Sequence, residues 1–420
     1  MIIFLLALIF ISKVSLAFLP FMPREFSVVI FQSGLHPYIN MALNVFLGGL
    51  LCAHWLWNAN PLYGQSRFFR FLLFVTSLFL LFITFLQTQF VNSDESFVLQ
   101  MGSAGMAVFT IFLYGRVLPT SLNPQRFVTF LKNATVILCW ISFLLLLVSP
   151  GTCFKGGRFI GIFKHIPHMV SCATMACFAV FYFIFAKKMS RLQLGFNWLS
   201  FALAFFLLLL TGTRSSLAAV ALGLFLAMFI FGSKTDGTRM LKFALALTGF
   251  LVVIFFGNSL SQFAIAVARG EESIGQRAAQ NGIESRMQEV ERGFAIFEKD
   301  QWLGQGLLSK FSSGNEADVS GYNANKDPHN IFISAGVIGG WGFIVITLIA
   351  FVAVGLAALK SLRSKSDAIK LLAIYVLTHL PILFIYHIHL SIGGIADRIY
   401  WMAFGYMALI ENDLPSDDTK

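Results

Sequence analysis

Long apolar segments separated by short polar ones recur along almost the whole chain. A helix needs about 20 mostly apolar residues to cross the hydrocarbon core of a membrane, so runs of this length indicate spanning helices. The pattern therefore predicts an all-α integral membrane protein with about twelve transmembrane helices. The predicted helices cover residues 2–22, 38–57, 68–89, 99–118, 127–149, 167–186, 194–211, 214–232, 240–260, 331–358, 368–386 and 390–410.

The first apolar segment, residues 2–22, has two interpretations, a cleaved signal peptide or a retained helix. No basic residue precedes its apolar run, and that run is long for a signal peptide. We therefore favour the retained helix.

One large polar segment, residues 261–329, interrupts the apolar pattern and holds most of the polar chemistry of the chain. Within it, residues 282–298 carry apolar side chains at helical spacing, which predicts an amphipathic helix. These apolar side chains are Ile283, Met287, Val290, Phe294 and Phe297. The predicted organisation is nine helices in residues 1–260, the loop 261–329, three helices in 330–410 and a cytoplasmic tail, 411–420.

Charge in the short loops predicts the orientation of the chain. Only 12% of the residues are charged, against about 25% in soluble domains. Lys and Arg gather in the loops that follow even-numbered helices, and such loops are cytoplasmic by the positive-inside rule. Both termini are then cytoplasmic, and the loop 261–329 lies on the outer face. The net charge of +10 thus reflects orientation, and it is not evidence for a nucleic-acid partner.

Basic side chains also gather on the predicted outer face. Arg214 follows a tight Thr-Gly-Thr turn at the start of one helix, and His329 lies at the start of another, with Asp327 as its N-cap and Pro328 in its first turn. Helix N-termini and Arg side chains bind anions, and a neutral imidazole can serve as a general base. Taken singly, Arg214 could be an interfacial anchor, Arg286 a salt-bridge residue and His329 a helix cap.

A second outer loop contains Lys155, Arg158 and Lys164, against the orientation trend. An anionic ligand such as a lipid diphosphate would explain positive charge there, and anionic lipid headgroups would explain it too. The sequence leaves both open.

The remaining polar residues do not form a recognisable site. The five Cys show no metal-ligand spacing and predict no structural disulfide. His379, His387 and His389 have no clear ligand geometry, and Asp397 with Arg398 could be a structural pair within the membrane.

Several short motifs occur in an order that resembles the O-antigen ligase and polymerase superfamily of bacterial membrane proteins. The likeness spans residues 100–410, although each motif alone is short. One departure is that a Gly-x-x-Gly pattern, Gly336 to Gly339, follows the His-Asn pair sooner than is usual in that family, so which glycines pack at the site stays open. The matching segments are GRFIGIF (157–163), LTGTRSS (210–216), Ser285 with Arg286, WLGQG (302–306) and His329 with Asn330.

The resemblance implies transfer of a glycan from undecaprenyl diphosphate to a sugar hydroxyl of the lipid A core, at the periplasmic face of the inner membrane, with no metal or other cofactor. It implies that Arg214 and Arg286 bind the diphosphate and that His329 acts on the acceptor hydroxyl. Arg158, Lys155 and Lys164 are further candidates for diphosphate binding, and Asn330 and Asp327 for support. In-line attack would invert the anomeric centre.

Three alternatives remain. An O-antigen or exopolysaccharide polymerase would need the same donor site, so the sequence does not separate it cleanly from a ligase. A protein O-glycosyltransferase commonly carries further C-terminal sequence, whereas about ten residues follow the last predicted helix. A transporter or flippase with twelve helices predicts internal symmetry and charges near the membrane midplane, and the sequence shows little of either.

Overall fold

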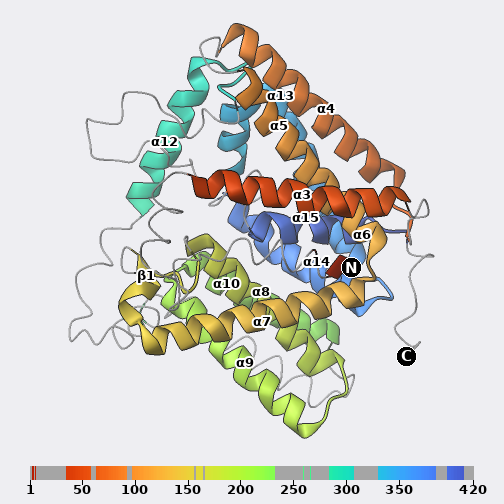
Figure 1. The fold of residues 1–420 in the computed structure, drawn as a ribbon, viewed down its shortest axis with the longest axis vertical. Coiled ribbons are helices and arrows are strands. Elements are labelled where there is room, and N and C mark those ends of the chain that lie inside the picture. Colours follow the sequence, from red (N-terminus) through yellow and green to blue (C-terminus); the bar gives the residue numbers. More distant parts are fainter. Residues whose placement is uncertain are drawn as a thin grey trace.

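The computed structural model describes residues 35–57, 63–91, 97–155, 158–163, 166–231, 283–306, 330–384 and 395–410, with isolated positions at 2–3, 5, 259 and 265. The described chain is almost entirely helical (Figure 1). Two groups of helices lie above and below a central layer in that view.

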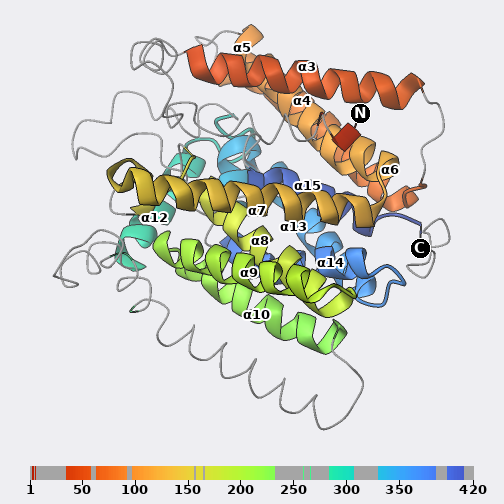
Figure 2. The same ribbon diagram turned by 60° about the horizontal axis from the view of Figure 1, so that its bottom comes forward.

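The lower group contains α7 (Pro124–Val148), α8 (Ile166–Ala186), α9 (Arg191–Leu210) and α10 (Arg214–Phe231). These helices run back and forth (Figure 2); the connections from α8 to α9 and from α9 to α10 are short, whereas a longer segment joins α7 to α8. The central helix is α8, which packs against the other three and against the central layer. Its residues are the most buried of all the long helices, because it contacts protein on nearly every side.

The upper group contains α3 (Leu35–Trp57), α4 (Arg67–Phe90) and α5 (Phe97–Phe112). Helix α5 continues through a π-helical turn, Leu113–Val117, into the short α6 (Leu118–Ser121). A π-turn adds one residue to a helix and loosens it locally, which here leaves a carbonyl for a side chain from another element. Many side chains of α4 point outward and are apolar, as expected of a helix that faces lipid.

Helix α13 (Ile331–Ser361) lies with α4 and α5 in the upper part of Figure 1, and the central layer contains α14 (Asp367–His379) and α15 (Ile395–Met407). Helix α15 contacts the π-turn and α6 of the upper group and α8 of the lower group, and so joins the two, while α14 packs against α15 and the lower group. Helix α14 passes into a 3-10 helix, Leu380–Phe384. Proline at position 381 explains this change, because it lacks the N–H that an α-helix would need there.

Three smaller elements lie on the left side of Figure 1, beyond the ends of the long helices. A 3-10 turn, Pro150–Cys153, follows α7 and leads into a two-stranded antiparallel hairpin, β1 (Phe154–Lys155) and β2 (Arg158–Phe159). Helix α12 (Ile283–Lys299) lies where the sequence predicts an amphipathic helix, and it packs against α13.

Seven described helices are long and apolar enough to cross a membrane, and each coincides with a predicted span. Three further predicted spans overlap α3, α14 with its 3-10 extension, and α15. The apolar helix within α3 is Val45–Trp57, and α14 and α15 have 13 residues each, so none of the three is among the seven. The predicted spans 2–22 and 240–260 lie almost wholly outside the described residues. The seven are Arg67–Phe90, Gln100–Ser121, Pro124–Val148, Ile166–Ala186, Arg191–Leu210, Arg214–Phe231 and Ile331–Ser361.

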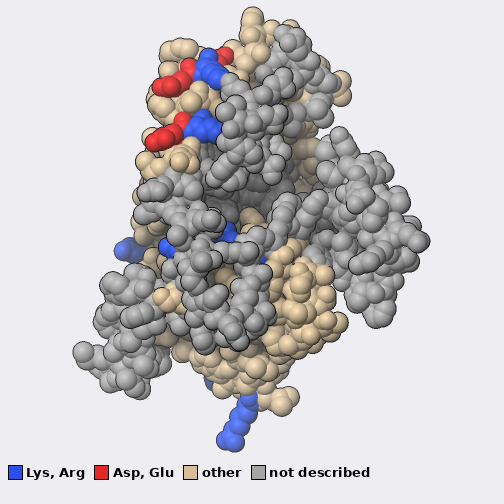
Figure 3. Space-filling view, turned by 90° about the vertical axis from the view of Figure 1, so that its left-hand side faces the viewer, with Lys and Arg blue, Asp and Glu red and all other residues tan. Residues whose placement is uncertain are grey.

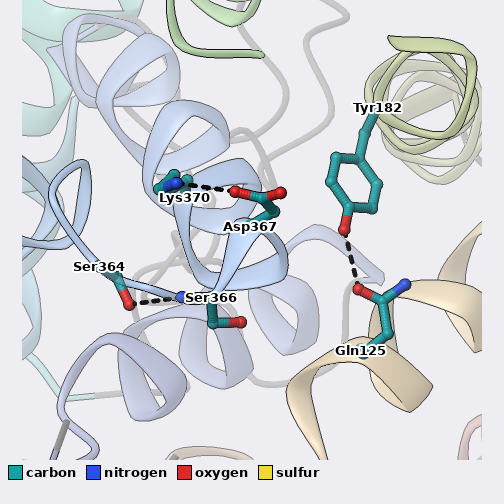
Figure 4. Close-up of polar contacts among 6 residues, drawn as sticks. All are labelled: Gln125, Tyr182, Ser364, Ser366, Asp367 and Lys370. Atoms are coloured by element: carbon teal, nitrogen blue, oxygen red, sulfur yellow. Dashed lines mark hydrogen bonds and ion pairs between the residues drawn. The ribbon is translucent and has the colours of Figure 1, made fainter. Parts of the chain in front are cut away.

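Specific polar contacts stabilise the end of the bundle that the charge pattern predicts to be cytoplasmic (Figure 4). The Tyr182 hydroxyl at the end of α8 donates to Gln125 Oε1 at the start of α7, at 2.8 Å. Lys370 pairs with Asp367 in the first turn of α14, at 2.7 Å.

A buried glutamine, Gln65, joins α15 to the π-turn near the same end. Its Nε2 donates to the carbonyl oxygens of Gly115, at 2.8 Å, and Gly405, at 3.1 Å. The two backbones cross closely, since a Cβ on Gly405 would lie 2.3 Å from the Gly115 oxygen. Glycine at 405 is therefore required by the crossing.

Candidate functional site

Arg214 opens α10 directly after the tight turn that joins it to α9 (Arg191–Leu210). Gly212 has a φ of 65°, a conformation that glycine adopts at little cost and that lets the chain reverse within three residues. The Arg214 side chain is exposed and makes no hydrogen bond or ion pair with any described residue. A permanently charged guanidinium thus stands at a helix N-terminus, where the N–H groups and helix dipole also favour an anion.

Arg158 holds this turn in place from the neighbouring hairpin. Its Nε donates to the Thr211 carbonyl oxygen at 2.8 Å, and its Nη2 donates to Thr213 Oγ1 at 2.7 Å. The turn residues Thr211 and Thr213 are buried, so these bonds are shielded from water. The sequence assigned Arg158 to the diphosphate, and the structure shows that two of its donors are directed to the turn before Arg214.

The predicted outer end of the bundle carries several basic groups. Figure 3 shows Lys and Arg side chains near the middle of that face, at the height of β1 and the start of α10, and mixed acidic and basic side chains above them, at the height of α12. The side chain of Lys155 and all of Lys164 lie outside the described residues.

Two predicted site residues also lie beyond the described part of the chain, namely His329 and Asp327. Arg286 lies in the first turn of α12, and its side chain is outside the described part too.

Asn330 is the residue that caps α13, which corrects the predicted helix start. Its backbone is extended (φ −139°, ψ 124°), and its Oδ1 accepts from the N–H groups of Phe332, at 3.0 Å, and Ile333, at 3.2 Å. Asp327 is therefore not the N-cap of this helix, and Pro328 is not in its first turn. The reason is that the asparagine oxygen already satisfies the two N–H groups that a cap must reach.

Helix α13 is broken at two glycines. Gly339 (φ −147°, ψ 27°) and Gly340 (φ 64°, ψ −162°) both depart from helical geometry. The break separates a first half-helix, Ile331–Ile338, from the longer remainder of α13. A Cβ on Gly340 would lie 2.2 Å from the Trp302 carbonyl oxygen, so only glycine fits there.

The turn that follows α12 takes up the backbone groups that this break exposes. In a continuous helix the Trp341 N–H would bond to the Val337 oxygen. Here the Trp341 N–H donates to the Gln301 oxygen at 2.9 Å, and the Val337 oxygen accepts from Gln305 N–H at 2.7 Å. Gly304, with a φ of 70°, allows this close approach. The motif WLGQG and the glycines of α13, far apart in sequence, therefore form one unit.

Gln87 of α4 completes that unit, and the sequence reasoning missed it. Its side chain is fully buried, and its Nε2 donates to the carbonyl oxygens of Leu303, at 2.5 Å, and Ile338, at 2.6 Å. The signal available in the sequence was an amide side chain in the last turn of an apolar helix. We call this unit, made of residues 301–306, Gly339, Gly340 and Gln87, the glycine junction.

An apolar cavity lies beside the glycine junction, between α4, α5, α13 and α15. Its lining includes Ile331 and Ile338 of the half-helix, and on the remainder of α13 it extends from Phe343 to Val354, about 16 Å at 1.5 Å per residue. Its lining is almost wholly hydrocarbon and aromatic. The lining residues are Leu72, Leu73, Thr76, Leu80, Ala107, Thr110, Ile111, Ile331, Ile338, Phe343, Ile346, Thr347, Ala350, Phe351, Val354, Leu383, Tyr400, Trp401 and Phe404.

The other polar residues noted in the sequence have structural surroundings. His379 is buried, and its Nδ1 lies 2.7 Å from the Tyr375 carbonyl oxygen one helical turn earlier. Arg398 is 2% exposed, with its guanidinium over the Tyr114 ring at 5.6 Å. The side chain of Asp397, and all of His387 and His389, lie outside the described residues.

Comparison with known proteins identifies the region that carries this geometry. Residues 199–347 match the family model described as O-antigen ligase, Wzy_C. The match includes the turn before α10, α12, the turn after α12, and the broken start of α13. No curated protein matches the chain in sequence. Residues 199–347 are thus similar to the O-antigen ligase domain, which is shared by ligases and polymerases that transfer lipid-linked glycans.

Proposed function

We propose that the protein is an O-antigen ligase, which transfers a glycan from undecaprenyl diphosphate to a sugar hydroxyl of the lipid A core. The reaction takes place at the periplasmic face of the bacterial inner membrane. The observation that carries this proposal is the family match over residues 199–347, because Arg214, Arg286 and His329 all lie within it.

Arg214 and Arg286 bind the diphosphate of the donor in this proposal. Arg214 suits that role because it is exposed, has no partner among the described residues and stands at the N-terminus of α10. Arg286 belongs to α12. Planar guanidinium groups match the oxygens of a diphosphate and stay charged at every physiological pH. Lys155 and Lys164 add positive charge, while Arg158 supports the turn that presents Arg214.

The apolar cavity beside the glycine junction receives part of the undecaprenyl chain. Its hydrocarbon lining offers an isoprene unit the same environment as the bilayer. Ile331 lines the cavity, and the proposed catalytic His329 is only two positions earlier in the sequence, so the lipid chain would bind close to that residue. This arrangement would bring the diphosphate to the membrane surface.

The proposed reaction is a direct displacement at the anomeric carbon of the donor. The acceptor oxygen attacks that carbon, its proton passes to neutral His329, and the anomeric C–O bond breaks with its electrons on the diphosphate. Undecaprenyl diphosphate leaves, stabilised by the two Arg side chains, and the anomeric configuration inverts. Because the leaving group is already anionic and stable, the reaction needs neither a carboxylic acid nor a metal ion.

A polymerase would use the same donor site, and it is the second candidate because the matched family contains both activities. Purified protein should be incubated with a donor glycan on undecaprenyl diphosphate and with two acceptors, lipid A core and a second lipid-linked repeat unit. We expect product on lipid A core, in the presence of EDTA as well as in its absence. Elongation of the lipid-linked glycan instead would establish the polymerase.

Two variants test the assigned roles. Arg286→Ala should abolish transfer while the protein still inserts in the membrane, and normal transfer would remove Arg286 from the mechanism. His329→Ala should abolish turnover but keep binding of undecaprenyl diphosphate. Loss of binding as well would argue against a general base at this position.

A further inference from the structure

Gln87 holds together two segments that adjoin the proposed site residues. Its Nε2 donates to the Leu303 oxygen, in the turn that follows α12, and to the Ile338 oxygen, at the end of the half-helix that Asn330 begins. Arg286 lies on α12, and His329 precedes Asn330. One amide therefore links the element that carries the proposed diphosphate ligand with the element that follows the proposed base.

The break in α13 makes this amide necessary. A continuous helix would pair the Ile338 oxygen with the N–H of residue 342, but non-helical geometry at Gly339 and Gly340 prevents that. Buried carbonyl groups need a donor, and Gln87 is fully buried at this point. The orientation of its amide follows, because the flipped amide would set Oε1 against two carbonyl oxygens.

We propose that Gln87 is a positioning residue of the glycan-transfer site, fixing α12 and the half-helix Ile331–Ile338 in one arrangement through the glycine junction. This inference rests on the proposed function. Without the Gln87 donors, the half-helix and the turn after α12 would lose their common support from α4. The His and Arg that these segments position would then take up a range of arrangements, and transfer needs reacting groups aligned within a fraction of an ångström.

Gln65 provides a matched control for the same chemistry elsewhere. It is also buried, and its Nε2 also donates to two carbonyl oxygens, those of Gly115 and Gly405. Those glycines lie near the predicted cytoplasmic end, in the π-turn and in α15. Removing the Gln65 amide should destabilise the fold as much as removing that of Gln87, but without disturbing the proposed site.

The variants are Gln87→Leu, which removes both donors with little change in volume, Gln87→Glu, which presents a carboxyl group to the two carbonyls, and Gln65→Leu. Each is purified in detergent, its folded fraction is quantified, and kcat and donor KM are measured per folded molecule. Amide hydrogen exchange is followed in peptides covering residues 283–306 and 330–341 of the same samples. The exchange measurement does not depend on activity.

For Gln87→Leu and Gln87→Glu we expect kcat to fall at least tenfold, donor KM to rise at least threefold because the support of the segment that carries Arg286 is lost, and exchange to accelerate in both peptides. For Gln65→Leu we expect kcat within twofold of the unmodified protein and no change in those peptides. Accelerated exchange with unchanged kcat would overturn the positioning role, and unchanged exchange would overturn the link itself. If the unmodified protein transfers no glycan, the proposed function fails, while the exchange data still decide whether Gln87 joins the two segments.

Discussion

Replacing Gly340 with alanine tests the glycine junction most directly. Gly340 has φ 64° and ψ −162°, a region that only glycine occupies readily, so an alanine there costs about 1–3 kcal/mol in backbone strain. The added Cβ would also lie 2.2 Å from the Trp302 oxygen and 2.5 Å from the Trp302 carbonyl carbon. Both contacts are with backbone atoms, so the turn after α12 must move away.

That movement breaks hydrogen bonds that join the turn to α13. The two closest are Trp341 N–H to the Gln301 oxygen and Gln305 N–H to the Val337 oxygen, each worth about 1 kcal/mol net and more if its groups stay buried without partners. Together with the strain, we expect Gly340→Ala to destabilise the fold by about 3–5 kcal/mol. This is a large part of the 5–15 kcal/mol typical of folded proteins.

The control is Gly102→Ala in α5, where an added Cβ would meet nothing within 4 Å. Alanine in a helix interior is about 1 kcal/mol better than glycine, so this variant should be at least as stable as the unmodified protein. The assay is the temperature at which each detergent-solubilised variant loses its monodisperse elution peak. We expect Gly340→Ala to lose this peak at a temperature at least about 5 °C below that of Gly102→Ala. If the two variants behaved alike, α13 would not be broken at this glycine as described.

Three further predictions follow from single contacts. Arg158→Leu removes two hydrogen bonds to the turn before Arg214, so we expect a lower thermal midpoint and a donor KM raised at least threefold. An unchanged donor KM would show that the turn does not need Arg158. Asn330→Ala should cost about 1 kcal/mol of stability and Asn330→Asp much less, since aspartate also caps; equal thermal midpoints for the two would exclude the cap. Burial raises the pKa of the Cys153 thiol to about 11, so iodoacetamide should label Cys153 at pH 7.5 only after unfolding, as followed by mass spectrometry; fast labelling of the native protein would contradict this.

The long helices could be predicted because each is determined by a local property of the sequence. An apolar run of about 20 residues has few other stable states in a membrane, which is why seven predicted spans coincide with described helices. The periodicity of residues 282–298 likewise predicted α12, but not which side of it would be buried. Phe297 packs on Trp341, while Met287 and Phe294 are exposed.

The glycine junction could not be predicted, because it depends on contacts between distant segments. An apolar run with a glycine pair predicts one continuous helix over 331–358, and nothing local shows that residues 301–306 will bond to Val337 and Trp341. Gln87 was missed for the same reason: its partners are more than two hundred residues away. Arg158 was a candidate for diphosphate binding because of its charge. Charge alone does not distinguish a side chain that binds an anion from a guanidinium that donates to a buried turn.

The break in α13 also determines how deep in the membrane the proposed site lies. Unbroken, the 31 residues of α13 would extend about 46 Å, well beyond the roughly 30 Å of the hydrocarbon core. The part after the break, Trp341–Ser361, is about 31 Å long and can span the core by itself. The half-helix before Gly339 then does not have to cross the core, and it can lie at the membrane surface. Gln87 lies about 30 Å along α4 from Arg67, a distance equal to the thickness of the hydrocarbon core, so Gln87 also lies at the outer surface of the core. The junction would thus keep Asn330, and the His329 before it, at the surface, where the diphosphate of a membrane-anchored donor must lie.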